Sequence, residues 1–158
     1  MYIQLLYIKE LENILKSTSS ISEAKTTVIS IFHVNSKIKD TLLLQLKPYD
    51  LSIEQYNVMR ILRGQKGKSI NLQDIQERMI NNMSNTTRLV DKLLKKKFVK
   101  RTICKNNRRK VEISITDLGL NVLNELDPVI ESTEQKITKH LNKKELKQLN
   151  NLLLKLKN

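Results

Sequence analysis

The chain has 158 residues, of which 29 are Lys or Arg and 16 are Asp or Glu, so its formal net charge is +13. A single Cys excludes an internal disulfide framework and indicates a reducing compartment. With only two His in addition to this Cys, a structural zinc site is disfavoured. No apolar run reaches the roughly 18 residues of a membrane span, and residues 1–8 lack the basic start and cleavage site of a signal peptide. We therefore expect a single-domain cytoplasmic protein with no membrane partner and no cofactor.

The positive charge is concentrated in one part of the chain. Residues 84–110 contain eleven Lys or Arg against one acid, Asp91, and carry +10 of the net +13. A basic zone of this kind inside a folded chain indicates a polyanion partner. The alternative is a solvated lysine-rich surface, because Lys outnumbers Arg 22 to 7 over the whole chain.

Two helices are predicted at the beginning of the chain. A short helix covers about residues 2–16, and Ser20 with Glu23 forms a possible capping box for a long helix. This second helix is expected to end near Lys47, because Pro48 disfavours helical geometry in the residue before it.

The long helix carries a seven-residue pattern that suits packing against other helices, including those of a second chain. Its positions are Ala24, Val28, Ile31, Asn35, Ile38 and Leu42. Asn35 would then fix the register of an apolar seam. In the alternative interpretation, Asn35 and His33 only border a mixed helix face.

A third helix is predicted from about residue 52. Ser52 and Gln55 form a capping box, and Leu51 and Tyr56 have the spacing of a hydrophobic staple. Gly64 is the expected stop.

The next segment predicts a helix-turn-helix. After a possible strand pairing at Ile70, one helix begins near Asn71, and a second runs from Met83 to about Lys96 with Asn82 as its N-cap. The second helix has an apolar inner face made of Thr86, Leu89, Val90, Leu93 and Leu94. Its outer face offers Ser84, Asn85, Arg88, Asp91, Lys92 and Lys95. Two short helices with an outward basic face are typical of this DNA-binding motif.

A β-hairpin is predicted directly after these helices. Residues 98–104 are rich in β-formers, and in the following strand Val111, Ile113 and Ile115 alternate with outward Lys110, Glu112 and Ser114. Residues 105–108 supply the turn. A hairpin in this position is the wing of a winged helix.

Two helices complete the predicted fold. Thr116 caps the first, in which Val122, Leu126, Val129, Ile130 and Ile137 form an apolar face and Pro128 is expected to kink or interrupt the helix. Asn142 and Glu145 begin the second, which carries Leu149, Leu152, Leu153 and Leu156.

From Leu51 to Leu156, the order of these motifs resembles the MarR-type winged-helix transcriptional regulators. Residues 83–94 look like the family's recognition helix, and Asn107, Arg108 and Arg109 with the run to Thr116 are similar to its wing signature. The resemblance implies a mainly α fold with a small β-hairpin wing. Residues 1–158 would form one domain, with dimerisation helices at about 1–48 and 117–158 and a DNA-binding lobe at about 51–116.

The sequence departs from the family pattern at two positions. Asn107 replaces the usual wing Asp, which removes a carboxylate that orients the wing arginines. Lys97 stands where a Gly usually ends the recognition helix, so Lys97 either adopts a left-handed conformation at some cost or changes the helix exit.

The resemblance implies a homodimer that binds a pseudo-palindromic double-stranded DNA site, and we expect this homodimer to act as a repressor. The expected DNA-binding residues are Ser84, Asn85, Thr87, Arg88, Lys92, Lys95, Lys105, Arg108, Arg109 and Lys110. Asn and Arg side chains suit base edges, lysines suit phosphates, and a wing Arg suits a narrow minor groove. Alternatives remain for several of them: Arg88 could pair with Asp91, Arg109 could be an ordinary strand residue, and residues 95–97 could be a solvated helix end.

A small aromatic or anionic effector is also implied, since many relatives release DNA when such a molecule binds. His33, Tyr56 and Arg60 could line its pocket, or could serve packing and surface roles only. Cys104 could sense oxidants beside cationic neighbours, or could be a small strand residue.

Other function classes have less support. An architectural or RNA-binding winged helix would use the basic zone without base specificity. An enzyme is disfavoured because the sequence offers no phosphate-binding glycine loop and no metal cluster. A pure protein-interaction module leaves the charge of residues 84–110 unexplained.

Overall fold

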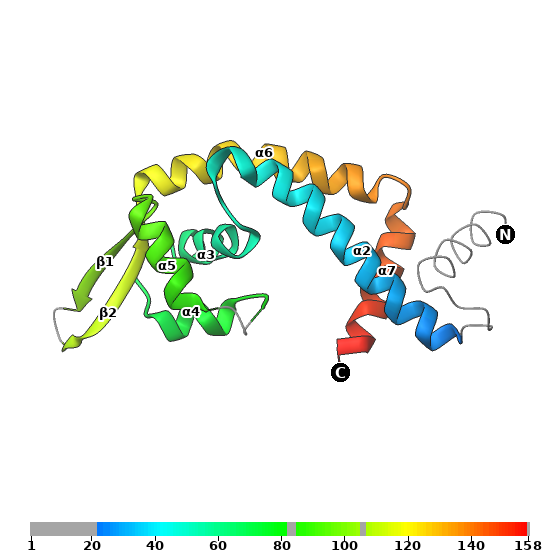
Figure 1. Ribbon diagram of the computed structural model, residues 1–158, viewed down its shortest axis with the longest axis horizontal. Helices are drawn as coiled ribbons and strands as arrows, with labels where there is room; N and C mark the ends of the chain where they lie inside the picture. The colour runs from blue at the N-terminus through cyan, green and yellow to red at the C-terminus, as the bar shows by residue number, and fades with distance from the viewer. Residues whose placement is uncertain (1–21, 82–84, 105–106, 158) are drawn as a thin grey trace. The chain divides into compact units, whose positions relative to one another are not determined.

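In the computed structural model, the chain is mainly helical with one two-stranded hairpin, as the sequence predicted (Figure 1). The structure describes residues 22–81, 85–104 and 107–157, which fall into two units, Met1–Asp40 and Thr41–Asn158. The elements are α2 (Glu23–Leu46), η1 (Lys47–Tyr49), α3 (Ile53–Gly64), α4 (Leu72–Arg78), α5 (Thr86–Lys95), β1 (Val99–Cys104), β2 (Asn107–Ile115), α6 (Asp117–Thr138) and α7 (Lys143–Lys157). None of the described helices is long and apolar enough to cross a membrane.

Helix α2 agrees with the predicted long helix. The Lys25 backbone N–H donates to Ser22 Oγ at 3.3 Å, which satisfies one of the unpaired groups at the start of the helix. The predicted helix over residues 2–16 and the capping role of Ser20 lie outside the described residues. At the other end, α2 gives way to η1, which contains Pro48 in its first turn.

The capping box of α3 is confirmed. The Gln55 N–H donates to Ser52 Oγ at 3.2 Å, and the Ser52 N–H donates to Gln55 Oε1 at 2.9 Å. Helix α3 ends at Gly64 as expected, but Gly64 is not the residue with left-handed backbone geometry. In the turn after α3, that geometry is found at Lys66, with φ 54°, and at Gly67, with φ 85°.

The two helices of the predicted helix-turn-helix are present, with one boundary corrected. Helix α4 begins with a capping box between Asn71 and Asp74 that the sequence analysis had overlooked. Helix α5 begins at Thr86 rather than at Met83, because Asn85 instead of Asn82 is the N-cap: its Oδ1 accepts the Arg88 N–H at 3.0 Å. The predicted inner face of α5 is buried or half-buried throughout.

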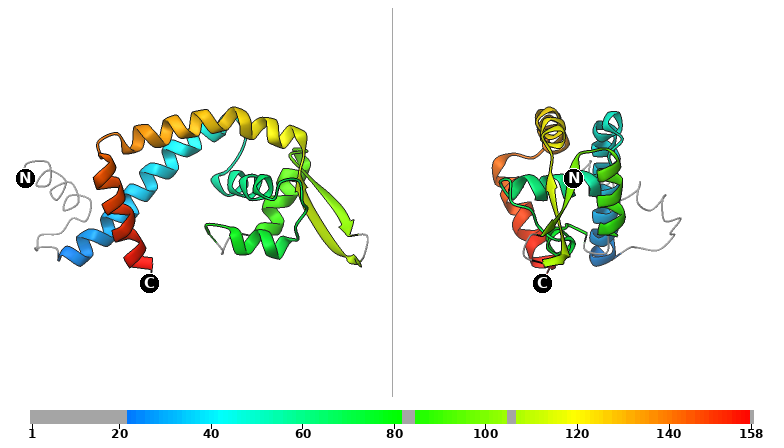
Figure 2. Two further views of the ribbon diagram at one scale, coloured as in Figure 1. Left: turned by 180° about the vertical axis from the view of Figure 1, so that it is seen from behind. Right: turned by 90° about the vertical axis from the view of Figure 1, so that its left-hand side faces the viewer.

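The hairpin projects away from the helices α3–α5 (Figure 2). Its strands are antiparallel, with Val99 opposite Ile115. The predicted turn over residues 105–108 is too long, because Cys104 pairs with Asn107 and β2 already includes Arg108. The register shifts next to this pair, which accounts for the extra residues on β2.

At its base, the hairpin forms an isolated antiparallel bridge with the segment before α4. The Ile70 and Ile113 backbones exchange two hydrogen bonds, of 3.0 and 2.7 Å, which confirms the predicted pairing at Ile70. Ser69 Oγ also donates to Glu112 Oε2 at 2.6 Å. Ser114, predicted to point outward, is only 7% exposed. The simple alternation of inward and outward residues therefore fails where the hairpin meets the helices.

Helices α6 and α7 follow the predicted pattern with two corrections. Helix α6 continues through Pro128, so the proline does not interrupt it, and the alternative of a kink stays a prediction. Val129 is exposed rather than part of the buried face. The capping box of α7 is confirmed, with the Asn142 N–H 2.8 Å from Glu145 Oε2 and the Glu145 N–H 3.0 Å from Asn142 Oδ1.

The core of the second unit joins α3, α4, α5, the base of the hairpin and the first half of α6. Its fully buried members include Val58, Met59, Ile75, Leu93 and Leu123. A bidentate ion pair also links α3 to α6, with Arg63 Nη1 and Nη2 at 2.6 and 3.1 Å from the Asp127 carboxylate oxygens. This hydrogen bonding with Asp127 raises the pKa of Arg63.

The start of α6 is packed tightly against the exit from α5. Lys97 adopts the left-handed conformation, with φ 61°, which is the first of the two alternatives that the sequence left open. The Thr116 N–H donates to the Phe98 carbonyl at 3.0 Å, and Thr116 Oγ1 accepts the Gly119 N–H at 3.1 Å. A Cβ on Gly119 would lie 2.2 Å from the Phe98 carbonyl oxygen.

This contact predicts that Gly119→Ala lowers the free energy of unfolding by about 1–3 kcal/mol, because a methyl group at this place must displace backbone. Gly64→Ala is the matched control, since no atom lies within 4 Å of a Cβ built there. At this helical position Ala should stabilise by up to about 1 kcal/mol. Urea unfolding followed by circular dichroism measures both. Equal effects of the two substitutions would contradict the tight contact.

Candidate nucleic-acid interface

The outward face of α5 is exposed and basic. Asn85, Thr87, Arg88, Lys92 and Lys95 are all exposed, as the sequence predicted for the outer side of this helix. Burial of Val90 and Leu93 on the opposite face fixes which way these side chains turn. Helix α5 therefore presents several cations to the outside.

The one acid on this face is held by a residue of the wing. Arg101 of β1 donates from Nη2 to Asp91 Oδ1 at 3.0 Å. The alternative pairing of Arg88 with Asp91 is not what forms, and among the described residues Arg88 has no acidic partner. The guanidinium donors of Arg88 are thus available to another group.

Asn85 plays a structural part that sequence reasoning had assigned to Asn82. Its side-chain oxygen is the cap acceptor of α5, so the amide is oriented with that oxygen toward the helix backbone. The amide NH₂ is left as the group through which Asn85 can meet a ligand. The capping position also places Asn85 at the N-terminus of α5, the end of a recognition helix that enters the major groove.

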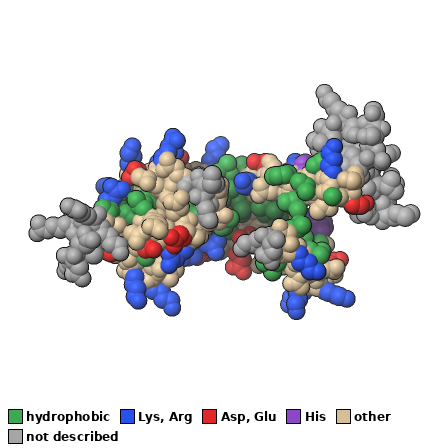
Figure 3. Space-filling view, turned by 90° about the horizontal axis from the view of Figure 1, so that it is seen from below, with side chains coloured by type: hydrophobic (Ala, Val, Ile, Leu, Met, Phe, Trp, Pro, Cys, Tyr) green, Lys and Arg blue, Asp and Glu red, His purple; other side chains and the backbone are tan. Residues whose placement is uncertain are grey.

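The wing contributes further expected residues, of which the structure describes the backbone. Arg108, Arg109 and Lys110 lie in β2, and Cys104 ends β1, while their side chains are outside the description. Ser84 and Lys105 also lie outside the described residues. Figure 3 shows Lys and Arg side chains around the part of the surface that carries α5 and the hairpin.

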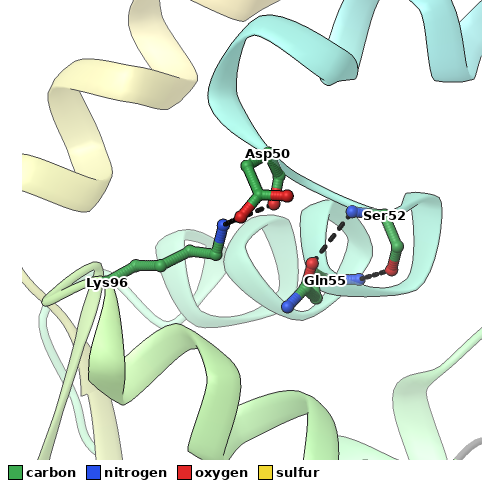
Figure 4. Close-up of polar contacts among 4 residues, drawn as sticks. All are labelled: Asp50, Ser52, Gln55 and Lys96. Carbon is green, nitrogen blue, oxygen red and sulfur yellow. Dashed lines mark hydrogen bonds and ion pairs between the residues drawn. The ribbon is translucent and has the colours of Figure 1, made fainter.

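Lys96 differs from its lysine neighbours at the end of α5. It donates from Nζ to both the carboxylate and the backbone carbonyl of Asp50, a residue with left-handed geometry that follows η1 (Figure 4). Hydrogen bonding and the charge of Lys96 lower the pKa of Asp50. The sequence analysis missed this pair, because the two residues are 46 positions apart and no local pattern connects them.

The three expected effector residues are only partly brought together. The Arg60 guanidinium carbon lies 5.7 Å from the centre of the Tyr56 ring, a cation–π distance. Burial raises the pKa of the Tyr56 phenol, which therefore stays protonated at neutral pH. His33 belongs to the other unit, and its part in a pocket remains an expectation. No group of three His, Cys, Asp or Glu side chains among the described residues has a geometry that would hold a metal ion.

Comparisons with known proteins agree with this geometry. Residues 51–111 match the model of the MarR family. The chain is 30% identical over 103 residues to the HTH-type transcriptional regulator SarZ of Staphylococcus epidermidis, covering 65% of this chain and 68% of SarZ. It is 37% identical over 68 residues to the uncharacterized HTH-type regulator YfiV of Bacillus subtilis, a match that spans 43% of this chain and 41% of that relative's length.

Solved structures show the same fold. The crystal structure of a MarR transcription factor from Planctomyces limnophilus has a TM-score of 0.67 at 27% identity, covering 85% of this chain and 98% of its own. A mutant MarR from E. coli complexed with operator DNA has a TM-score of 0.77 at 24% identity, covering 88% of this chain and 99% of its own. With the family model and the match to SarZ, these structures lead to one conclusion. The chain belongs to the MarR family, and its matched relatives are HTH-type transcriptional regulators.

Proposed function

We propose that this protein is a sequence-specific double-stranded DNA-binding regulator that acts as a homodimeric repressor and is released from DNA by a small ligand. The observation that carries the proposal is the exposed face of α5, where Arg88, Lys92 and Lys95 project while the nearby acid Asp91 is bound to Arg101. A protein surface that neutralises its own acid and leaves its cations exposed suits a polyanion.

The roles of the α5 residues follow from their chemistry. Arg88 has the planar pair of donors that fits a guanine edge, and Asn85 offers amide donors at the N-terminal end of the helix. Thr87, Lys92 and Lys95 suit phosphates, which set the position of the protein on the duplex without specifying sequence. Ser84 completes the proposed base-reading set.

The wing supplies the second part of the proposed interface. The backbone of β2 carries Arg108, Arg109 and Lys110 along the hairpin, and Lys105 precedes that strand. A wing Arg in the neighbouring minor groove would favour the narrow groove of AT-rich DNA. The ion pair between Asp91 and Arg101 supports this arrangement, because it connects α5 directly to β1.

Exposed apolar side chains on the terminal helices support the homodimer. In α7, Leu149, Leu152, Leu153 and Leu156 are 41–62% exposed, and in α2 Val28 and Ile31 are exposed. The α7 leucines are three, four and seven positions from Leu149, so they share one helix face, and an exposed apolar face of this kind marks an interaction site. Two copies related by a two-fold axis would present two α5 helices to a pseudo-palindromic site with half-sites about 10 bp apart.

Ligand release rests on a smaller observation. Tyr56 and Arg60 form a cation–π pair on α3, which offers an aromatic face and a positive charge to an anionic aromatic molecule. His33 is the third proposed member of the pocket.

Arg88→Ala and Arg109→Ala are each expected to weaken binding to the preferred duplex by about 1–3 kcal/mol and to leave the fold intact. Fluorescence anisotropy over a salt series, with DNA from upstream of the protein's own gene and a scrambled duplex, measures the effect. The wild type should prefer its site by roughly a thousandfold. Lys147→Ala on α7 is the control. Wild-type affinity in both arginine variants would refute the assigned interface, and equal affinity for every duplex after unbiased site selection would favour an architectural role.

Leu152→Glu is expected to raise the dimer dissociation constant roughly a hundredfold or more, because each buried Leu contributes about 1.5–3 kcal/mol and a dimer contains two copies. Sedimentation equilibrium measures the constant. Asn151→Glu places the same charge on the neighbouring exposed residue and should leave the dimer intact. A monomeric wild type, or equal effects of the two substitutions, would argue against the proposed interface.

Calorimetry with a panel of phenolic acids tests ligand release. We expect at least one acid to bind the wild type and to lower its affinity for DNA. Arg60→Gln should weaken that binding about tenfold, since a charge-assisted hydrogen bond is lost. Absence of heat across the panel, or unchanged binding by the variant, would count against this pocket.

A further inference from the structure

A cleft between the start of α3 and the end of α5 is lined almost entirely by hydrogen-bond donors. Its volume is about 360 Å³, and its lining consists of Asp50, Gln55, Lys92, Lys95 and Lys96. All five residues belong to the second unit. The cleft shares Lys92 and Lys95 with the exposed face of α5, so the inference below deepens the proposed function and partly rests on it.

The capping box determines which end of the Gln55 amide is available. Gln55 Oε1 accepts the Ser52 N–H at 2.9 Å, so the amide oxygen is directed at the backbone of α3. The Nε2 group must then point the other way, toward the side on which Lys96 lies (Figure 4). Gln55 thus presents a donor to the cleft that it lines, and not an acceptor.

Within the part of the chain that the structure describes, this donor has no protein partner. Gln55 is 4% exposed, and its buried Nε2 lacks any hydrogen-bond partner among the described residues. Leaving a buried donor unsatisfied costs about 1–3 kcal/mol, so such a group in a folded protein calls for an explanation. A ligand that supplies an acceptor would remove this cost.

The charges around Gln55 define what kind of acceptor fits. Lys92, Lys95 and Lys96 bring three positive charges, and Asp50 brings one negative charge that is already bound to Lys96. The net charge of +2 disfavours a cation and matches a doubly charged oxyanion. Lysine ammonium groups bind phosphate as point charges from several directions, without the planar geometry that a carboxylate shares with Arg.

We propose that this cleft binds a phosphate group, with the Gln55 amide and the three lysines as its ligands. The phosphate would compete with the Asp50 carboxylate for Lys96. Binding would therefore alter the link between the turn before α3 and the end of α5. Two sources share this chemistry: a backbone phosphate of DNA and a free phosphate-bearing molecule.

The primary test is an NMR titration of the full chain with inorganic phosphate, compared with chloride at equal ionic strength. The Gln55 side-chain NH₂ resonances should shift and saturate with phosphate only. Gln55→Glu should abolish saturable binding, because it keeps the acceptor for the Ser52 N–H and replaces the donor with a negative charge. Glu is also a favoured residue at this capping-box position, so α3 should still form.

A second variant keeps the test decisive if Gln55→Glu impairs folding. The double substitution of Lys92 and Lys95 by Gln changes exposed residues only, and it should weaken phosphate binding about tenfold or more. The double substitution of Lys68 and Lys100 by Gln removes the same charge from exposed positions outside the cleft and should bind phosphate like the wild type.

DNA binding by Gln55→Glu separates the two sources. If the phosphate belongs to DNA, the variant should bind specific and scrambled duplexes about tenfold more weakly, and its salt slope should fall by about one. If the phosphate belongs to a free molecule, the DNA affinity of Gln55→Glu should equal that of the wild type, while inorganic phosphate saturates the cleft of the wild type only.

Saturable phosphate binding by the wild type or weaker DNA binding by Gln55→Glu supports the site. The absence of both effects overturns it. Equal phosphate binding by the lysine double variant and its control would also overturn it. The phosphate titration needs no DNA, so it still decides the matter if the protein proves not to bind DNA with sequence preference.

Discussion

The backbone around the Phe98 carbonyl is the constraint on which the DNA-binding lobe depends. The Phe98 carbonyl oxygen accepts a hydrogen bond from the Thr116 N–H at 3.0 Å. The Thr116 hydroxyl donates to the carbonyl oxygen of Lys97 at 2.7 Å. Gly119 leaves the space that this close approach needs. Four chain segments therefore meet at one place: the residues after α5, the start of β1, the end of β2 and the start of α6. The direction of the wing relative to α5 is set there, even though Lys97 must adopt a left-handed conformation without being glycine.

The charges of α5 are divided between holding the lobe together and facing outward. Asp91 is bound to Arg101 of the wing, and Lys96 is bound to Asp50 before α3, so one pair positions the helix against β1 and the other against the preceding turn. Arg88, Lys92 and Lys95 have no acidic partner among the described residues. The composition counts Lys96 and Arg101 as positive charges in the same way as Arg88, Lys92 and Lys95. Only Arg88, Lys92 and Lys95, which lack an acidic partner among the described residues, belong to the surface to which we assign DNA.

The lobe and the terminal helices differ in what covers their apolar side chains. In the lobe, Met59, Ile75, Leu93 and Ile113 are fully buried within a single chain. In α7, leucines at helical spacing remain exposed, although the helix begins with a complete capping box. Local signals are thus sufficient to start α7, while the described residues leave its apolar face largely uncovered. This difference is the physical basis for assigning association to the ends of the chain.

The sequence by itself determined every element that a local pattern specifies, because capping boxes, apolar periodicity and turn residues act over a few positions. The boxes at Ser52 and Asn142, the cap at Thr116 and the inner face of α5 all follow from such patterns. Where two local signals competed, the sequence pattern did not decide between them: Asn85 caps α5 in place of Asn82, and β2 includes residues that were predicted to form a turn. Only the tertiary structure decided the pairs between distant residues, such as Lys96 with Asp50 and Arg101 with Asp91, and the buried donor of Gln55. Such contacts depend on how helices and strands pack, and no spacing along the chain encodes them.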